Sequence, residues 1–230
     1  MVGSIRAVLF DFDGVIADTE TLHFQAFVDV FDEIGIRVTE EDYNNIYIAL
    51  SDRDTIRAAF ERAGRPQPRG GLYGELMRKK AERYEELAEK GAPLFPGVRE
   101  CVERLSERLP VAIGSGALYG EIMAILNAHG IAHLFVGAVG ADMVLNSKPD
   151  PETYLQACAL INEKRGMDID PRDCAVIEDT DVGIRAGKSA GMRALGVANT
   201  YPPERLKEAD AVVDSLEGLT LEAMERLLSP

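Results

Sequence analysis

Short apolar segments that do not alternate with polar residues recur along the chain, and segments with helical periodicity lie between them. Unbroken apolar segments are typical of strands covered on both faces, and they occur at residues 7–12, 111–116, 134–140, 174–180, 193–199 and 210–216. Helical patterns occur at 96–109, 119–130 and 150–166, the last with Asp150 as N-cap and Pro151 in the first helical position. The alternation predicts an α/β fold with a parallel sheet.

One part of the chain, from about residue 18 to residue 91, interrupts this alternation because its pattern predicts helices and no convincing strand. The helical segments are residues 18–35, 51–64 and 74–91. We therefore expect a helical cap of residues 17–92, inserted into a core of residues 1–16 and 93–230. Its natural place is above the carboxyl end of the first strand, as a lid.

Composition narrows the class of protein. The chain has 230 residues, of which 46% are hydrophobic and 28% charged, so it can bury a sizeable core. The formal net charge of −14 argues against sequence-independent nucleic-acid binding, which needs a basic surface. Three cysteines lie far apart without a CxxC motif, and no apolar stretch has membrane-spanning length. We expect a soluble, cytoplasmic, monomeric protein that binds neither nucleic acid nor membrane.

Two aspartates, Asp11 and Asp13, end the first apolar segment in the stretch AVLFDFDGVIADTE. Burying charge is unfavourable unless something pairs with it. Ligands of open α/β sheets bind at the carboxyl ends of strands, and the two-residue period lets both carboxylates point to one side. Gly14 permits a sharp turn or the close approach of a ligand. For this motif alone, a pair of turn-forming aspartates remains the alternative.

Further polar groups fall at the same ends of later strands. Glu178 and Asp179 end CAVIEDT, Ser115 ends VAIGSG, and Lys148 precedes a predicted helix. Each alone could be an ordinary cap, a loop hydroxyl or a surface lysine. Their shared position at the carboxyl ends of strands favours a single site.

These segments together resemble the four motifs of the haloacid dehalogenase superfamily of phosphohydrolases. The motifs are DFDGVIADT, the strand ending in Ser115, Lys148-Pro149 and IEDTDVGIRAGKSAGM, and their order and spacing fit over essentially the whole chain. The helical insert is similar to that of the beta-phosphoglucomutase-like subgroup. The resemblance implies a Rossmann-like core with an inserted α-helical cap. It also implies phosphoryl transfer, because the dehalogenases of the superfamily lack an aspartate at the place of Asp13 and need no metal.

The resemblance implies roles for the acidic residues. Asp11 would be the nucleophile that forms an aspartyl-phosphate, and Asp13 would be the general acid and base. Mg²⁺ would bind the Asp11 carboxylate, the Asp13 carbonyl and Asp179, and Glu178 would be a further carboxylate that orients the site.

The other motif residues would bind the phosphoryl group. Ser115 and the backbone N–H groups of Gly116 and Ala117 would hold its oxygens, and Lys148 would neutralise charge on the nucleophile and the phosphate.

In the cap, the resemblance extends to Thr19, His23, Arg53 and Lys80 as substrate-binding residues. His23 would face the active site, although it could also simply lie on a helix beside apolar neighbours. Arg53 resembles an arginine that holds a distal phosphate, although it could also make an ordinary pair on a solvated helix.

The function that we expect is Mg²⁺-dependent hydrolysis of a small phosphorylated metabolite, such as a sugar phosphate. A beta-phosphoglucomutase-type phosphosugar mutase is the alternative enzyme, but Leu50 and Phe27 depart from the mutase pattern. A non-catalytic phosphate- or metal-sensing protein is the alternative of another class, and the intact set of motif residues counts against it.

Overall fold

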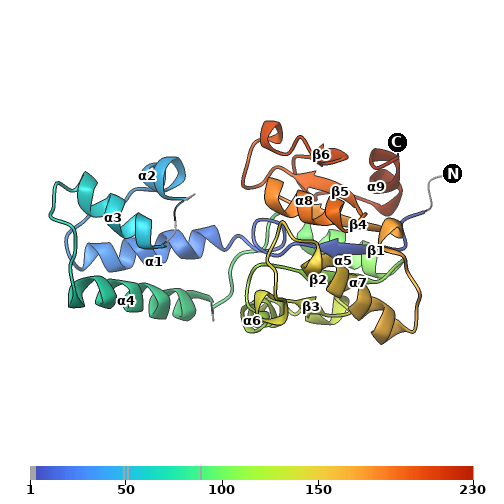
Figure 1. The fold of residues 1–230 in the computed structure, drawn as a ribbon, viewed down its shortest axis with the longest axis horizontal. Helices are drawn as coiled ribbons and strands as arrows, with labels where there is room; N and C mark the ends of the chain where they lie inside the picture. Colours follow the sequence, from blue (N-terminus) through green and yellow to red (C-terminus); the bar gives the residue numbers. More distant parts are fainter. Residues whose placement is uncertain (1–3, 49, 51, 89, 230) are drawn as a thin grey trace. The chain divides into compact units, whose positions relative to one another are not determined.

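The computed structural model describes residues 4–48, 50, 52–88 and 90–229, and Figure 1 shows its fold. The chain divides into two compact units. The first, here called the core unit, is Met1–Asp18 with Pro93–Pro230, and the second, the helical unit, is Thr19–Ala92.

The core unit is built on a six-stranded sheet in which every pair of neighbouring strands is parallel. The strand order is β3-β2-β1-β4-β5-β6. The strands are β1 (Ala7–Phe10), β2 (Val111–Gly114), β3 (Ala138–Val139), β4 (Cys174–Glu178), β5 (Arg193–Val197) and β6 (Ala211–Val213). The sheet confirms the predicted α/β fold with a Rossmann-like parallel core. It also places β1 between β2 and β4, so the carboxyl ends of these three strands are neighbours.

Helices cover the sheet. They are α5 (Val98–Ser106), α6 (Tyr119–Ala128), α7 (Glu152–Arg165), α8 (Asp181–Ser189) and α9 (Leu221–Leu227). Helix α7 lies against β1, β2 and β3, and α8 lies against β4 and β5. Leu9, Val176, Ile161 and Ile184 belong to one buried cluster that joins these two helices to the strands. Burial of this apolar surface stabilises the core unit and fixes the strand ends that carry the site.

Two sequence expectations for the core unit need correction. The third strand was expected over 134–140 but is only Ala138–Val139; Leu134 belongs to a 3-10 turn, Ala132–Leu134, and the strand begins four residues after it. Helix α7 begins at Glu152 after Pro151, not after Asp150, although an Asp150 carboxylate oxygen still accepts a hydrogen bond from the Glu152 N–H at 3.0 Å.

The helical unit contains α1 (Glu20–Asp32), α2 (Glu40–Asp42), a π-helical turn (Tyr43–Tyr47), α3 (Asp52–Arg62) and α4 (Gly71–Ala88). None of its described residues lies in a strand. Its own buried cluster includes Phe27, Phe31, Ile56, Phe60 and Leu76, which come from the three longer helices. The apolar stripes of these helices thus pack on one another.

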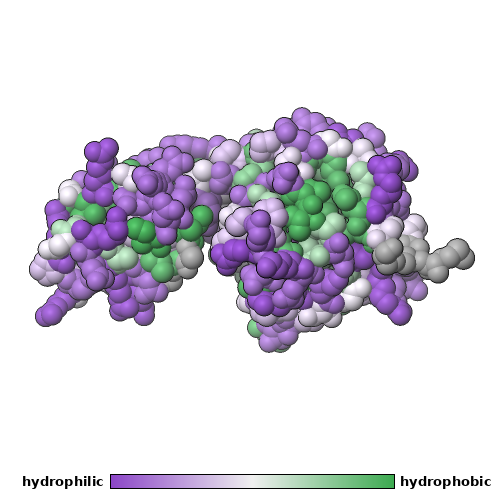
Figure 2. All heavy atoms as spheres, turned by 90° about the horizontal axis from the view of Figure 1, so that it is seen from above, coloured by the Kyte–Doolittle hydropathy of each residue, from purple (hydrophilic) through white to green (hydrophobic). Residues whose placement is uncertain are grey.

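One face of the protein is largely hydrophilic (Figure 2). Hydrophilic side chains cover much of the face seen in Figure 2, and a gathering of hydrophobic side chains is visible on the core unit. Within the described part of the chain, no helix has the length and apolar character needed to cross a membrane.

Candidate active site

The site is assembled where β1, β2 and β4 end. Asp11 follows β1 directly, and its N–H still donates to the Ile177 carbonyl of β4 at 2.9 Å. Glu178 is the last residue of β4, and Ser115 follows β2, with its N–H donating to the Val139 carbonyl at 3.0 Å. All three side chains are buried. The ladder hydrogen bonds therefore hold polar side chains at one edge of the sheet, where Rossmann-like folds bind ligands.

Lys148 joins two of these strand ends. Its ammonium group donates to Asp11 Oδ1 at 2.8 Å, to Glu178 Oε1 at 2.7 Å and to the Tyr154 hydroxyl at 2.9 Å. An ammonium group has three donors, so each of them has a partner. Lys148 is thus held in one position between the carboxylates of β1 and β4.

Glu178 is hydrogen-bonded through both carboxylate oxygens. Oε1 also accepts from the Tyr154 hydroxyl at 2.7 Å. Oε2 accepts from the Thr180 hydroxyl at 3.0 Å and from the Asp179 N–H at 3.1 Å. Gly183 of α8 passes so close that a Cβ atom there would lie 1.7 Å from Oε1. The Glu178 side chain is therefore held rigidly, by its hydrogen bonds and by the close approach of Gly183.

Asp179 differs from Glu178 because one of its carboxylate oxygens has no hydrogen-bond partner among the described residues. It is 2% exposed, and Oδ1 is buried without a hydrogen-bond partner among the described residues. Gly14 lies directly beside it with a φ of +77°, and a Cβ atom on Gly14 would lie 1.9 Å from Asp179 Oδ2. A buried carboxylate oxygen without a donor is unfavourable unless a cation binds it.

The charges and pKa values of the cluster also favour a bound cation. Burial and then the charge of Glu178 raise the pKa of Asp11, Lys148 lowers it, and the net result is a pKa of about 7. Burial and the charges of Asp11 and Glu178 raise the pKa of Asp179 to about 8. Burial disfavours the charge of Lys148, but the two carboxylates outweigh this and leave its pKa raised. Three carboxylates around a single ammonium group leave excess negative charge.

These residues fit a metal ion. Asp11, Glu178 and Asp179 each offer an oxygen, and the three oxygens lie within 4.8 Å of one another. Hard divalent cations prefer carboxylate oxygens, and Mg²⁺ also keeps several waters. The unpaired Asp179 Oδ1 and the excess negative charge are what a divalent cation would satisfy.

The remaining motif residues of the core unit follow the ends of β1 and β2. Asp13 is half-buried, and its backbone bridges to Ala17. The Ser115 hydroxyl accepts a hydrogen bond from the Ala117 N–H at 3.0 Å, so this N–H is engaged within its own loop. Gly116 is exposed, with open space where a Cβ atom would be.

In the helical unit, the structure brings together two of the four expected substrate-binding residues. Lys80 is 3% exposed, and its ammonium group contacts His23 Nδ1 at 2.7 Å and donates to Asp52 Oδ2 at 2.8 Å. An ammonium group cannot accept, so Nδ1 is the acceptor and the ring proton is on Nε2. Burial, followed by the charge of Lys80, lowers the pKa of His23 to about 4. His23 is therefore neutral at pH 7.

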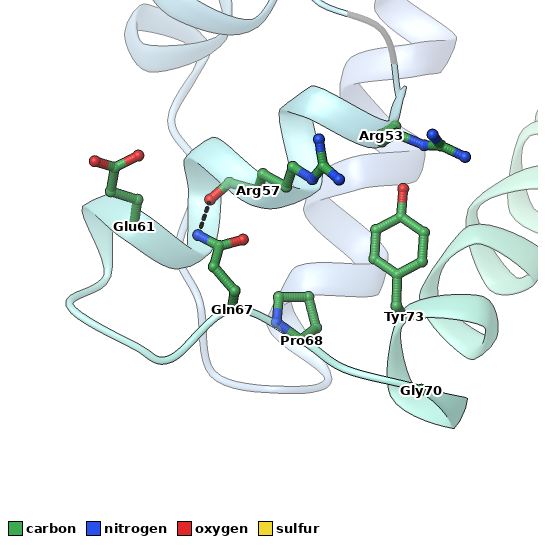
Figure 3. A pocket seen from close by; sticks show the side chains of 7 residues that line it. All are labelled: Arg53, Arg57, Glu61, Gln67, Pro68, Gly70 and Tyr73. Atoms are coloured by element: carbon green, nitrogen blue, oxygen red, sulfur yellow. Dashed lines mark hydrogen bonds between the residues drawn. The ribbon is translucent and has the colours of Figure 1, made fainter.

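The other two residues do not join this group in the contacts that the structure shows. Thr19 is buried and precedes α1, where its carbonyl accepts hydrogen bonds from the N–H groups of Leu22 and His23. Arg53 lines a separate hollow with Arg57, shown in Figure 3. The predicted substrate contacts of Thr19 and Arg53 stay predictions.

Sequence reasoning missed two residues of these clusters. Tyr154 lies six positions after Lys148, where the helical pattern marks it only as an apolar core position. Asp52 is adjacent to Arg53, and its pairing with Lys80 joins residues 28 positions apart. No local spacing signal could have found either contact.

Comparisons with known proteins agree with this geometry. Residues 8–197 match the family described as haloacid dehalogenase-like hydrolase. A beta-phosphoglucomutase of Bacillus subtilis is 33% identical over 223 residues, which cover 96% of this chain and 94% of that protein. A phosphorylated carbohydrates phosphatase of Thermotoga maritima is 31% identical over 211 residues, covering 90% and 93%. The solved structure of CbbY from Rhodobacter sphaeroides in complex with phosphate has a TM-score of 0.70 and 27% identity, covering 94% of this chain and 96% of that chain.

The parallel sheet, with a buried carboxylate–lysine cluster at the carboxyl ends of its strands, has the features of a Rossmann-like enzyme. The chain belongs to the haloacid dehalogenase-like hydrolases. The resemblance inferred from the four motifs is thereby confirmed, including the beta-phosphoglucomutase-like subgroup.

Proposed function

We propose that this protein is a Mg²⁺-dependent phosphatase that hydrolyses small phosphorylated metabolites, most naturally sugar phosphates, through an aspartyl-phosphate on Asp11. The observation that carries the proposal is the position of Asp11. Its carboxylate is buried at the end of β1 and is bonded to Lys148 at 2.8 Å, in a cluster with the unpaired oxygen of Asp179. The names of the phosphatase and mutase relatives support a sugar phosphate as substrate.

Lys148 and the carboxylates prepare Asp11 for this role. Lys148 holds Oδ1, which orients the carboxylate and leaves Oδ2 as the oxygen for attack. The raised pKa of Asp11 would leave part of it protonated near pH 7 without a cation. When bound at Asp11 and Asp179, Mg²⁺ supplies the positive charge that favours the ionised carboxylates and offsets charge on the phosphoryl group.

Asp13 would move the protons. In the first step, a carboxylate oxygen of Asp11 forms a bond to phosphorus while the bond from phosphorus to the ester oxygen breaks. Asp13 gives its proton to that oxygen, and the alcohol leaves. In the second step, water gives a proton to Asp13 and attacks phosphorus, and the bond to Asp11 breaks. Phosphate leaves, and both aspartates are restored.

A phosphosugar mutase is the second candidate, favoured by the cluster of His23 and Lys80 on the helical unit and by the Bacillus subtilis relative. A mutase must hold a phosphate at both ends of its bisphosphate intermediate. The charge of Lys80 is already balanced by Asp52 at 2.8 Å, which weakens this cluster as a second phosphate site. Hydrolysis is therefore the better-supported function.

The test is phosphate release from a panel of phosphate monoesters with Mg²⁺, beside a coupled assay for glucose 6-phosphate formed from β-glucose 1-phosphate. We expect free phosphate from sugar phosphates, abolished by EDTA and by Asp11→Asn. Asp168→Asn makes the same chemical change at an exposed site of the core unit and should retain activity. Glucose 6-phosphate with little free phosphate would show a mutase instead. Full activity of Asp11→Asn would overturn the proposed nucleophile.

A further inference from the structure

The helical unit contains a hollow that the proposed phosphatase chemistry does not use. It has a volume of about 690 Å³ and lies between α3, the loop that follows α3, and the start of α4. Its volume is in the range of pockets that bind small molecules. It shares no lining residue with the cluster of His23, Asp52 and Lys80.

One face of α3 lines this hollow with charged side chains. Arg53, Arg57 and Glu61 are four residues apart and so project from the same side of the helix. Figure 3 shows the Arg53 and Arg57 side chains at one end of the hollow and Glu61 at the other. The end with the two arginines is therefore positive, although the whole chain has a formal net charge of −14.

The two guanidinium groups are available to a ligand. The Arg53 guanidinium makes no ion pair or hydrogen bond within the described part of the chain. Among the described residues, the Arg57 guanidinium pairs only with Asp54, at 3.5 Å, and both side chains of this pair are more than half exposed, at 59% and 52%. Exposed ion pairs of this kind contribute little, so an anion that binds Arg57 loses little by displacing Asp54.

The Tyr73 hydroxyl is a second, independent indication that a ligand binds in the hollow. Its hydroxyl oxygen is buried and has no hydrogen-bond partner among the described residues. In Figure 3 the ring rises from the first turn of α4 and directs the hydroxyl toward the side of α3 that carries Arg53 and Arg57. Gln67 also lines the hollow. Its side chain is held in place because its amide donates a hydrogen bond to the Arg57 carbonyl at 3.0 Å. Two guanidinium groups and an orphaned hydroxyl thus converge on one end of the hollow.

We propose that this hollow is a second binding site, which takes an anion with two adjacent phosphate groups and needs no metal. Guanidinium groups bind phosphate oxygens in pairs, and neighbouring arginines on one helix face match two linked phosphates better than one. The Tyr73 hydroxyl donates to one further oxygen. The site is separate from the carboxylate cluster and does not depend on the phosphatase proposal.

The experiment is calorimetric titration of the full chain with inorganic pyrophosphate, in EDTA. Without a divalent cation, the carboxylate cluster of Asp11, Glu178 and Asp179 repels anions, so binding reports the hollow. We expect one saturable site with tighter binding than for inorganic phosphate. Arg57→Gln should weaken binding about ten-fold or more, because it removes charge-assisted hydrogen bonds, and Tyr73→Phe should weaken it about five-fold.

Two control variants separate this site from general electrostatics. Arg78→Gln removes the same charge from the exposed face of α4, where Arg78 pairs with Glu82 at 2.6 Å, and should keep the wild-type affinity. Asp11→Asn changes the core unit and should also keep it. Absence of saturable binding would overturn the proposal. So would a loss for Arg78→Gln as large as that for Arg57→Gln, or an affinity that changes with Asp11→Asn. Circular dichroism of each variant verifies the helical fold.

The same titration, repeated with a nucleoside diphosphate and with a hexose bisphosphate, distinguishes two kinds of metabolite that carry two phosphates. A nucleoside diphosphate that binds as tightly as pyrophosphate identifies the linked phosphate pair as the recognised group. A hexose bisphosphate carries its two phosphates on separate carbons, so tighter binding of it than of pyrophosphate would overturn the assignment to linked phosphates. Because neither titration requires turnover, failure of this proposal and failure of the phosphatase proposal give different results.

Discussion

The Tyr154 hydroxyl donates a hydrogen bond to Glu178 Oε1 at 2.7 Å, on the same oxygen that accepts from Lys148 at 2.7 Å. Lys148 also donates to the Tyr154 hydroxyl at 2.9 Å, so the three groups form a closed triangle. Tyr154 is fully buried on α7. The triangle holds the lysine that is bonded to Asp11, so Tyr154 would help to position Asp11, the proposed nucleophile.

Replacing Tyr154 with phenylalanine tests whether its hydroxyl helps to position Lys148 and Asp11. The variant leaves one lysine donor and one carboxylate lone pair without a partner in a buried site. We expect the free energy of unfolding to fall by about 1–2 kcal/mol and kcat to fall about ten-fold, with KM little changed. Steady-state kinetics and urea unfolding measure both. Tyr119→Phe, at a position 42% exposed, is the control and should behave as wild type. An unchanged kcat for Tyr154→Phe would show that the triangle is only structural.

Gly14→Ala tests the close approach of the first motif to Asp179. The new Cβ would lie 1.9 Å from Asp179 Oδ2, and the φ of +77° disfavours any residue but glycine. We expect loss of Mg²⁺ binding and of activity, and destabilisation by about 2 kcal/mol or more. Gly120→Ala is the matched control, because nothing lies within 4 Å of a Cβ there and its φ is not in the left-handed region. Retained Mg²⁺ affinity in Gly14→Ala would contradict the account of this turn.

Asp179→Asn should change metal affinity and stability in opposite directions. The amide removes a negative charge that is crowded by Asp11 and Glu178, so the metal-free protein should be no less stable and its Tm in EDTA equal or higher. Mg²⁺ affinity should fall about ten-fold or more, because a carboxylate ligand is lost. Calorimetric titration with Mg²⁺ and thermal unfolding in EDTA give the two values. A Mg²⁺ affinity equal to wild type would remove Asp179 from the metal site.

His23 predicts a pH dependence in the helical unit. Its folded pKa of about 4 lies below the ordinary value of 6.5, because burial and Lys80 disfavour the charged ring. Between these pH values the unfolded chain binds more protons, so stability falls as pH falls from about 6.5 to about 4, by an amount on the order of 2–3 kcal/mol. NMR titration of the three histidines should show one with a pKa near 4.

A variant isolates this effect. His23→Gln should flatten the dependence of stability on pH in this interval. His133→Gln, at an exposed position of the core unit, should leave it unchanged. If His23 titrates near its ordinary value of 6.5, the contact with Lys80 does not persist in solution.

Local pattern was enough for the six strands, for helices α1, α3, α4, α5, α6 and α7 and for the motif positions, but it placed several boundaries wrongly. Helices α2, α8 and α9 were not among the predicted segments. All six strands lie inside the predicted apolar segments because β-strands covered on both faces must be apolar throughout. The third is shorter than predicted, and Leu134 at its expected start belongs to a 3-10 turn. Helix α4 begins at Gly71, three residues earlier than expected, inside the predicted loop.

The sequence by itself determined that Asp11, Ser115, Lys148, Glu178 and Asp179 follow strands or open a helix, because those positions depend on local periodicity and turn residues. Only the tertiary structure decided which of them touch. The order of the strands puts β1 beside β4 and thereby brings Asp11 and Glu178 to one lysine. Contacts between residues far apart in the chain, such as Lys80 with Asp52, depend on how apolar faces pack, and packing is a property of the whole fold.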